Sequence, residues 1–252
     1  MIYAAAAVAL LTYGRGFARL RRRRPALAPA WAAWSFAAGV TVAAAALVSP
    51  LDGEADRSLT AHMGQHLLVG DVAPLLMAAA LRGPLALFAV PAPFLRTMSR
   101  SPGVRRCLCF LLRKPVSLAV WCVVLYAWHS PLLYDAALTH PGVHAIEHAS
   151  LLAASFLVWM QVMDSRRSPG GRAAFAGVVL LAGMPLAEVL LATKPIYSAY
   201  PGAADQAHAA VAMMAEQVAT LGVAALLLLR SHVERVAAPA QPWRRAQRSE
   251  AQ

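Results

Sequence analysis

Seven apolar stretches constrain the fold of this chain more than any other feature of its sequence. They lie at about residues 1–19, 30–49, 59–80, 115–129, 142–163, 173–192 and 204–229. About 20 apolar residues cross a bilayer as an α-helix, because a helix satisfies its backbone hydrogen-bonding groups within its own segment. Only 14% of the 252 residues are charged, against roughly 25% in a soluble domain. We therefore predict an all-α, polytopic membrane bundle of seven transmembrane helices.

The basic residues predict how this bundle is oriented. Four of the connecting and terminal segments hold 21 of the 23 lysines and arginines, namely 15–29, 81–114, 164–172 and 230–252. Loops rich in lysine and arginine stay in the cytoplasm. The N-terminus is therefore expected outside and the C-terminus in the cytoplasm. The first stretch is interpreted as a span and not as a signal peptide, because its positive charges follow the apolar run.

Charge and cysteine content narrow the class of protein further. We expect one seven-helix domain over 1–230 and a polar cytoplasmic tail over 231–252. The net charge of +11 is then a topology signal that also attracts anionic membrane lipid. The sequence contains no basic-aromatic repeat, so we expect no nucleic acid partner. The three cysteines form no disulfide framework. Cys107 and Cys109 make a C-x-C pair, but apolar filling is the simpler interpretation.

Histidines gather at one side of this predicted topology. Seven of the eight are expected near the outer face: His62, His66, His129, His140, His144, His148 and His208. Imidazole is the commonest metal ligand among side chains. Ionisable groups within a membrane are costly, so they are candidates for function. We expect a metal site in this outer layer.

Two histidine pairs form the centre of the predicted site. His62 and His66 are four residues apart, as are His144 and His148, and such residues share one face of a helix. The helical rise puts both pairs roughly 5–10 Å below the outer edge. Glu147 lies near the same face as the second pair. Facing helices in a bundle can enclose a metal with ligands of this kind.

Other polar residues of this layer have weaker claims. His129 and His140 border the outer loop, where a solvated side chain is an equal interpretation. Asp71 precedes Pro74 by three residues, so it either satisfies backbone groups that the proline leaves free or carries a proton or ion. Methionines could add thioether ligands that favour cuprous copper, although packing is commoner: Met63, Met213 and Met214. The aromatic residues Trp128, Tyr134, Tyr197 and Tyr200 are interpreted as an interfacial belt.

Three stretches carry a pattern that resembles a known family. They are His62-Met63-Gly64-Gln65-His66-Leu67-Leu68 running on to Asp71-Val72-Ala73-Pro74, then Trp128-His129-Ser130-Pro131-Leu132-Leu133-Tyr134-Asp135 continuing to His144-Ala145-Ile146-Glu147-His148, and the scattered Tyr197, Tyr200 and Asp205-Gln206. Together they resemble the multi-pass CtaG-type family of cytochrome c oxidase assembly factors, associated with caa-type oxidases. The resemblance is specific over 58–163 and thins to scattered positions over 195–214.

This resemblance implies a seven-span protein of the bacterial plasma (inner) membrane that matures a haem–copper oxidase of the respiratory chain. It also suggests that the protein handles copper. The family positions carried over are His62, His66, Asp71, His129, His144, Glu147, His148 and Asp205. The chain departs from the family at His208, where a small residue is commoner, and at Met213-Met214. The cysteine mechanism of an unrelated single-span copper chaperone with the same name does not transfer to Cys107 and Cys109.

Two other functions fit parts of the pattern. His144 to His148 also reads H-x-x-E-H, in which two histidines bind zinc and the glutamate is the base of a metallohydrolase. Histidines on different helices could instead ligate haem. A transporter with a histidine-lined entrance is a further alternative, although no inverted repeat supports it.

The leading hypothesis is a non-enzymatic copper chaperone for the oxidase. The core ligands would be His62, His66, His144 and His148, which His129 and Glu147 complete or orient. Asp71 and Asp205 would be structural or would support these ligands from outside. The expected partners are the oxidase subunits and a periplasmic or extracellular copper donor. Release to a partner predicts a shallow site that is open to the outer face.

Overall fold

The computed structural model describes residues 2–48 and 50–237, and within these ranges it contains helices and no strand. The helices are α1 (Ile2–Arg23), α2 (Ala30–Val48), α3 (Pro50–Ala55), α4 (Leu59–Leu67), α5 (Ala73–Ala80), α6 (Pro84–Ala89), α7 (Ala92–Arg100), α8 (Pro102–Leu111), α9 (Lys114–Trp128), α10 (Pro131–Thr139), α11 (Pro141–Met163), α12 (Pro169–Ala192), α13 (Ala203–Gln217) and α14 (Val223–Ala237). Two π-helical turns, η2 (Leu68–Val72) and η3 (Val218–Gly222), join α4 to α5 and α13 to α14. The all-α prediction is confirmed.

Several helices are long and apolar enough to cross a membrane. Within the part of the chain that the structure describes, five pass by length and hydropathy: Pro25–Val48, Leu59–Ala80, Pro141–Met163, Pro169–Ala192 and Ala203–Val236. A sixth arises if α8 and α9, which meet at a bend of 75°, are taken as one broken span. The chain is therefore a multi-pass membrane protein. The predicted first span coincides with α1, which is helical but not among these five or six, so the count of seven remains a prediction.

Local sequence signals explain where many helices begin. Proline occupies the first turn of α5, α6, α7, α8, α9, α10, α11 and α12, where its missing N–H is not needed. The side chains of Ser58, Ser101 and Ser168 cap α4, α8 and α12 by accepting a backbone hydrogen bond. These signals stop one apolar helix and start the next.

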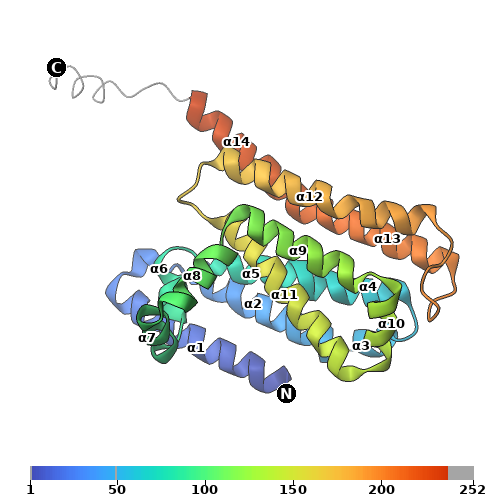
Figure 1. Cartoon of the computed structure of the whole chain (residues 1–252). Helices are drawn as coiled ribbons and strands as arrows, with labels where there is room; N and C mark the ends of the chain where they lie inside the picture. The colour runs from blue at the N-terminus through green and yellow to red at the C-terminus, as the bar shows by residue number, and fades with distance from the viewer. Residues whose placement is uncertain (1, 49, 238–252) are drawn as a thin grey trace.

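The helices pack around two apolar cores. α1, α2, α5 and α6 share the smaller core, which contains Tyr13 stacked on Phe36. The larger core joins α4 and α5 to α9–α14 and contains Trp159 and Leu190. In Figure 1 the long helices run side by side, with α3 and α10 at one end of the bundle and α6, α7 and α8 at the other.

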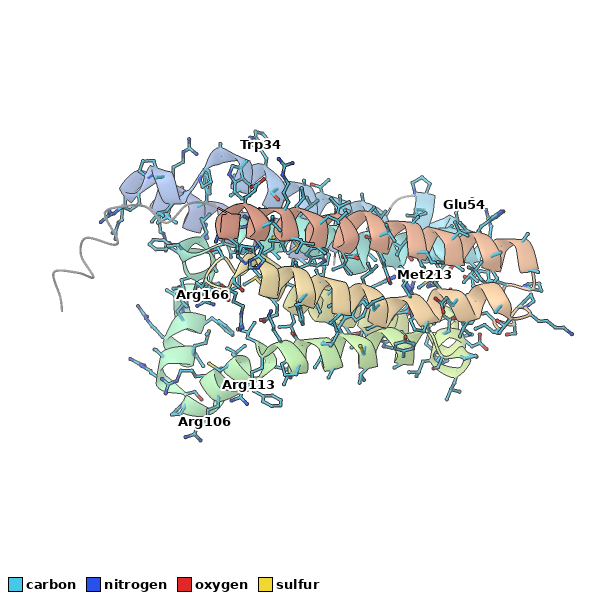
Figure 2. The ribbon with its side chains drawn as sticks, turned by 90° about the horizontal axis from the view of Figure 1, so that it is seen from above. Trp34, Glu54, Arg106, Arg113, Arg166 and Met213 are labelled. Carbon is cyan, nitrogen blue, oxygen red and sulfur yellow. The ribbon has the colours of Figure 1, made fainter. Side chains whose placement is uncertain are left out.

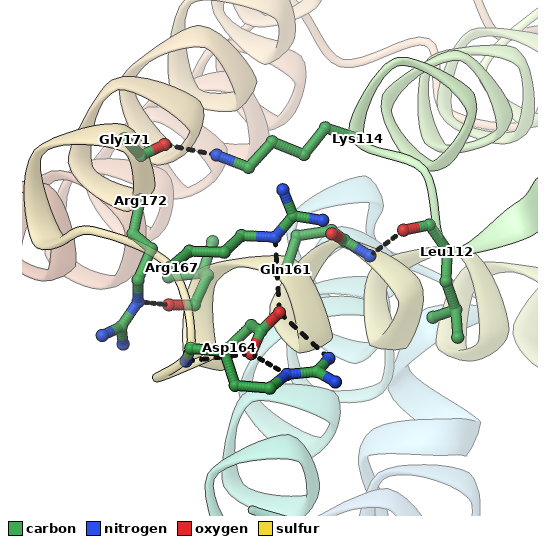
Figure 3. Close-up of polar contacts among 9 residues, drawn as sticks. Leu112, Lys114, Gln161, Asp164, Arg167, Gly171 and Arg172 are labelled. Atoms are coloured by element: carbon green, nitrogen blue, oxygen red, sulfur yellow. Dashed lines mark hydrogen bonds and ion pairs between the residues drawn. The ribbon is translucent and has the colours of Figure 1, made fainter. Parts of the chain in front are cut away.

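Basic side chains concentrate at the end formed by α6, α7 and α8. Figure 2 shows Arg106, Arg113 and Arg166 toward that end and Glu54 toward the opposite end. A network of polar contacts ties the helix ends together there (Figure 3). Its contacts are Asp164 with Arg166 and Arg167, Gln161 with the Leu112 carbonyl, Arg172 with the Val162 carbonyl, and Lys114 with the Gly171 carbonyl.

The C-terminal prediction is tested only in part. α14 continues to Ala237, beyond the boundary at residue 230 that the sequence suggested. The rest of the predicted tail, residues 238–252, lies outside the described residues.

Candidate metal centre

α4 carries the first histidine pair, and its start is held by another helix. Asp205, in the first turn of α13, accepts hydrogen bonds from the backbone N–H groups of Leu59 and Thr60 at 2.6 and 3.0 Å. It also accepts from the hydroxyls of Ser58 and Thr60. A carboxylate at a helix N-terminus satisfies free N–H groups and favours the helix dipole. Asp205 thus supports the site by fixing α4 and lies outside the histidine groups.

The first pair lies deep between the helices. His62 and His66 are 1% and 5% exposed, and their Nε2 atoms are 3.0 Å apart. His62 Nδ1 also lies 3.4 Å from the Tyr200 hydroxyl. Both imidazoles therefore face the interior from one side of α4, as the spacing predicted.

α11 brings the second pair to the same place. The His144 and His148 rings have centroids 4.3 Å apart. Across the helices, His62 lies 5.5 Å from His144 and His66 lies 5.3 Å from His148, again between centroids. Four imidazoles from two distant segments therefore form one cluster, which we call the histidine cluster.

Glu147 joins the two sides of the histidine cluster. Its side chain is fully buried, and Oε1 lies 3.4 Å from His66 Nε2. Two sets of three residues each offer ligand atoms that all lie within 4.8 Å of one another: His62, His144 and Glu147, and His66, Glu147 and His148. Imidazole with carboxylate suits zinc, copper, iron and nickel among the common metals.

Several ligand atoms of this cluster lack hydrogen-bond partners. Four of them are buried without a partner among the described residues: His144 Nε2, His148 Nε2 and both carboxylate oxygens of Glu147. His66 presents its Nε2 to His62 and Glu147, so its unpaired Nδ1 is not counted with them. Buried polar groups in native proteins are nearly always paired, so each unpaired group needs an explanation. A bound cation would satisfy the imidazole nitrogens and the carboxylate together. The residues present therefore fit a metal ion.

The cluster is more enclosed than the sequence suggested. We expected a shallow site open to the outer face, but His62, His66, Glu147 and His148 are all at most 5% exposed. His144 alone of the core residues is half-buried. The reason is the packing of α10 and the segment before α13 over the cluster, which hydropathy does not reveal. His144 is thus the most accessible residue of the cluster.

Of the remaining histidines in the predicted layer, one lies beside the histidine cluster and two lie apart from it. His129 is 5% exposed and its ring centroid lies 5.7 Å from that of His66, but its Nδ1 contacts the Leu125 carbonyl at 2.7 Å. It stands beside the two ligand groups and belongs to neither. His140 and His208 are exposed. Of the predicted outer layer, the structure brings five histidines together and leaves two apart.

Three tyrosines cover the histidine cluster. The sequence suggested that they form an interfacial belt, but they are buried. Tyr134, Tyr197 and Tyr200 are at most 3% exposed. Tyr134 stacks on Tyr197 at 4.0 Å and lies 5.0 Å from His62, between ring centroids. Burial raises the pKa of the Tyr134 phenol well above its usual range, so the group stays neutral. α10 packs against α9 and α11 and carries Tyr134, while Tyr197 and Tyr200 are held inward by hydrogen bonds from their hydroxyls to the His129 and Ala55 carbonyls.

Asp71 lies away from the histidine cluster. Its carboxyl accepts from Trp159 Nε1 at 2.5 Å and from the Thr220 hydroxyl at 3.2 Å. It therefore bonds side chains, and not the backbone groups near Pro74 that were one of its expected partners. The backbone near Pro74 is accommodated by the π-turn η2, in which the Ala73 N–H reaches the Leu68 carbonyl.

Two methionines lie beside the histidine cluster, whereas the C-x-C cysteines lie far from it. Met63 and Met213 are buried and line a cavity together with His66 and His129, and Figure 2 shows Met213 between the long helices. Cys107 and Cys109 are exposed on α8, far along the bundle from the cluster (Figure 1). The thiols therefore lie outside the candidate metal centre.

A family model covers most of the chain. Comparison with curated proteins and with solved structures found no significant match. The family described as cytochrome c oxidase caa3 assembly factor (Caa3_CtaG) matches residues 11–235. This range includes every helix from within α1 to α14 and all residues of the histidine cluster. The chain therefore belongs to the caa3-type cytochrome c oxidase assembly factor family.

Proposed function

We propose that this assembly factor binds a copper ion in the histidine cluster and passes it to a cytochrome c oxidase subunit. The observation that carries the proposal is the set of four buried ligand atoms without partners on His144, Glu147 and His148, beside the His66 Nε2 that faces Glu147. Leaving these groups unpaired costs stability, and one cation removes that cost for the imidazoles and the carboxylate at once. The role is one of binding and delivery without catalysis.

Copper is favoured by the ligands and by what surrounds them. Imidazole and carboxylate bind both zinc and copper, whereas thioethers select cuprous copper. Met63 and Met213 line the cavity that adjoins His66. That cavity measures about 50 Å³, well below the roughly 300–1,000 Å³ of pockets for organic ligands. The arrangement therefore favours a compact ion over haem.

The membrane orientation is part of the same proposal. The chain would cross the bacterial plasma membrane seven times, with its N-terminus outside and α1 as the first span. Arg106, Arg113 and Arg166 at the end away from the histidines support this arrangement (Figure 2), because basic residues favour the cytoplasmic side. The cluster then faces the compartment from which an extracytoplasmic copper donor could load it.

Copper binding is tested on the purified full chain. Cuprous copper is added under anaerobic conditions, and bound metal is measured for the wild type, His148→Ala and His140→Ala. We expect one tight ion in the wild type, a loss of at least tenfold in affinity for His148→Ala, and no change for the exposed His140→Ala control. Wild-type protein that binds no copper, or binding lost equally in both variants, contradicts the proposal.

Delivery is tested in cells that lack the protein. Complementation with the wild type or His140→Ala should restore copper-loaded oxidase, whereas His148→Ala should give oxidase with little copper. Normal oxidase copper with His148→Ala would separate assembly from the metal site. A Soret absorption band in the purified protein would favour haem, and peptide cleavage that Glu147→Gln abolishes would favour a hydrolase.

A further inference from the structure

A second buried ionisable group lies in the core of the bundle, away from the histidine cluster. Asp71 sits within the π-turn η2, and Glu216 lies on α13 just before the π-turn η3. α4 and α13 pack against each other, and both carboxyl groups line one cavity of about 50 Å³. The Thr220 hydroxyl bridges the two residues, because it lies 3.2 Å from Asp71 Oδ2 and 3.1 Å from the Glu216 backbone carbonyl. Single π-helical turns inside α-helices occur frequently at functional sites. Both of the π-turns in the described chain flank this acid pair.

The hydrogen bonds of the pair are one-sided. Asp71 Oδ1 accepts from Trp159 Nε1, and the Thr220 hydroxyl can donate either to Asp71 Oδ2 at 3.2 Å or to the Glu216 backbone carbonyl at 3.1 Å. Trp159 is 1% exposed, so its N–H is held rigidly in place. Both oxygens of Glu216 are buried and receive no hydrogen bond from a donor. The surroundings therefore favour a negative charge on Asp71 and offer nothing to a negative charge on Glu216.

Among the described residues, no lysine or arginine lines the cavity that Asp71 and Glu216 share. The side chains that bond Asp71 are Trp159 and Thr220, and the carboxylate oxygens of Glu216 have no partner. The titratable residues that share the cavity are His66 and His129. Two carboxylates this close together in an apolar interior repel each other strongly, and one of them then holds a proton.

The cavity beside the pair connects it to the histidine cluster. Asp71, Glu216, Gln217, His66 and His129 all line this cavity of about 50 Å³. Gln217 and His66 are each 5% exposed, and Gln217 Oε1 and His66 Nδ1 lack a partner. The cavity is lined mostly by apolar side chains, but its size leaves room for a few water molecules where these polar atoms gather. Water there would link His66 Nδ1 to the carboxyl pair.

We propose that Asp71 and Glu216 form a proton-binding site in the core of the bundle. Glu216 carries the proton and donates it to the Asp71 carboxylate, which Trp159 and Thr220 stabilise. The proton exchanges with the outer solution through the cavity beside His66. This site is distinct from the proposed metal ligands and does not depend on copper binding.

Infrared spectroscopy of the metal-free full chain in liposomes tests the proposal. A protonated carboxylic acid gives a C=O stretching band that is separate from carboxylate bands and shifts in D₂O. We expect such a band in the wild type at neutral pH, with a shift soon after transfer to D₂O. Glu216→Gln should remove it, because the amide can still donate to Asp71 and thereby preserve the fold. The exposed Glu234→Gln is the matched control and should keep the band.

Two further variants assign the band. Glu147 is also a buried carboxyl without a hydrogen bond, so the spectrum is repeated in Glu147→Gln, where the component that Glu216→Gln removes should persist. Thr220→Val deletes one donor to Asp71 and should shift that component without removing it. A purely structural role for Thr220 would leave the frequency unchanged.

Several outcomes overturn the proposal. One is a wild-type spectrum without a carboxylic acid band, which needs no variant to interpret. Another is a band that remains at full size in folded Glu216→Gln. If the band appears only when sodium is replaced by choline, a metal cation and not a proton lies between the carboxylates. If Glu216→Gln does not fold, the spectrum is recorded for Asp71→Asn instead. This variant should shift the frequency of the Glu216 band, and an unchanged frequency contradicts the proposal.

Discussion

The contact between Asp205 and the start of α4 leads to a quantitative prediction. Asp205→Ala removes the acceptor of two backbone N–H groups, those of Leu59 and Thr60 at 2.6 and 3.0 Å. Hydrogen bonds to a charged group contribute about 1.5–3 kcal/mol each. Asp205 is only partly buried, so water can replace it in part and the lower end of this range applies. We expect the free energy of unfolding to fall by about 2–4 kcal/mol.

The assay is chemical unfolding in mixed micelles followed by far-ultraviolet circular dichroism. Asp205→Asn keeps one acceptor oxygen but loses the charge, so it should lose about half as much. Glu54→Ala is the control, because its pair with Arg57 is exposed and such pairs contribute about 0–1 kcal/mol. Equal effects of Asp205→Ala and Glu54→Ala would refute the reasoning, since they would show that the interhelical cap contributes no more than a surface pair.

Three further predictions rest on single contacts. Gly16→Ala should lower the free energy of unfolding by about 1–3 kcal/mol, because the added Cβ would lie 2.2 Å from a backbone oxygen of α6. Gly14→Ala should leave it unchanged, since a Cβ there meets nothing within 4 Å. Thermal unfolding compares the two variants. Tyr134→Ala should cost about 3–5 kcal/mol in the same assay, but Tyr134→Phe should be nearly neutral because the buried hydroxyl has no partner. The hydrogen bond from Arg166 holds the pKa of Asp164 below its usual range, so wild type should exceed Asp164→Asn in stability by under about 1 kcal/mol at neutral pH. That difference should vanish as pH falls through the lowered pKa, and its persistence in acid would contradict the assignment.

The periodicity of the histidines predicted much of the candidate site. Residues four apart on a helix share a face, so the inward aim of His62 with His66 and of His144 with His148 follows from spacing alone. The position of Glu147 near the face of His144 follows from its spacing of three residues. The sequence could not show that tyrosines cover the cluster, because the burial of Tyr134 depends on how α10 folds back over α4.

Glu216 is the residue that sequence analysis passed over. It stands within an apolar span, and an intramembrane carboxylate is by itself a signal for function. Its partner could not have been identified, since 145 positions separate it from Asp71. The two meet because α4 and α13 pack together, which brings both residues to one cavity.

The sequence by itself determined the class of fold, the membrane setting and the family. Apolar length, basic loops and short motifs are local properties, and each can be read without knowing which helices are neighbours. Tertiary structure alone decided which polar groups meet. In the folded bundle Asp205 caps α4, and the histidines that were expected near solvent are enclosed. Asp71 and Glu216 lie together there. Contacts between helices depend on packing across the whole bundle, and many sequences with the same hydropathy could pack differently.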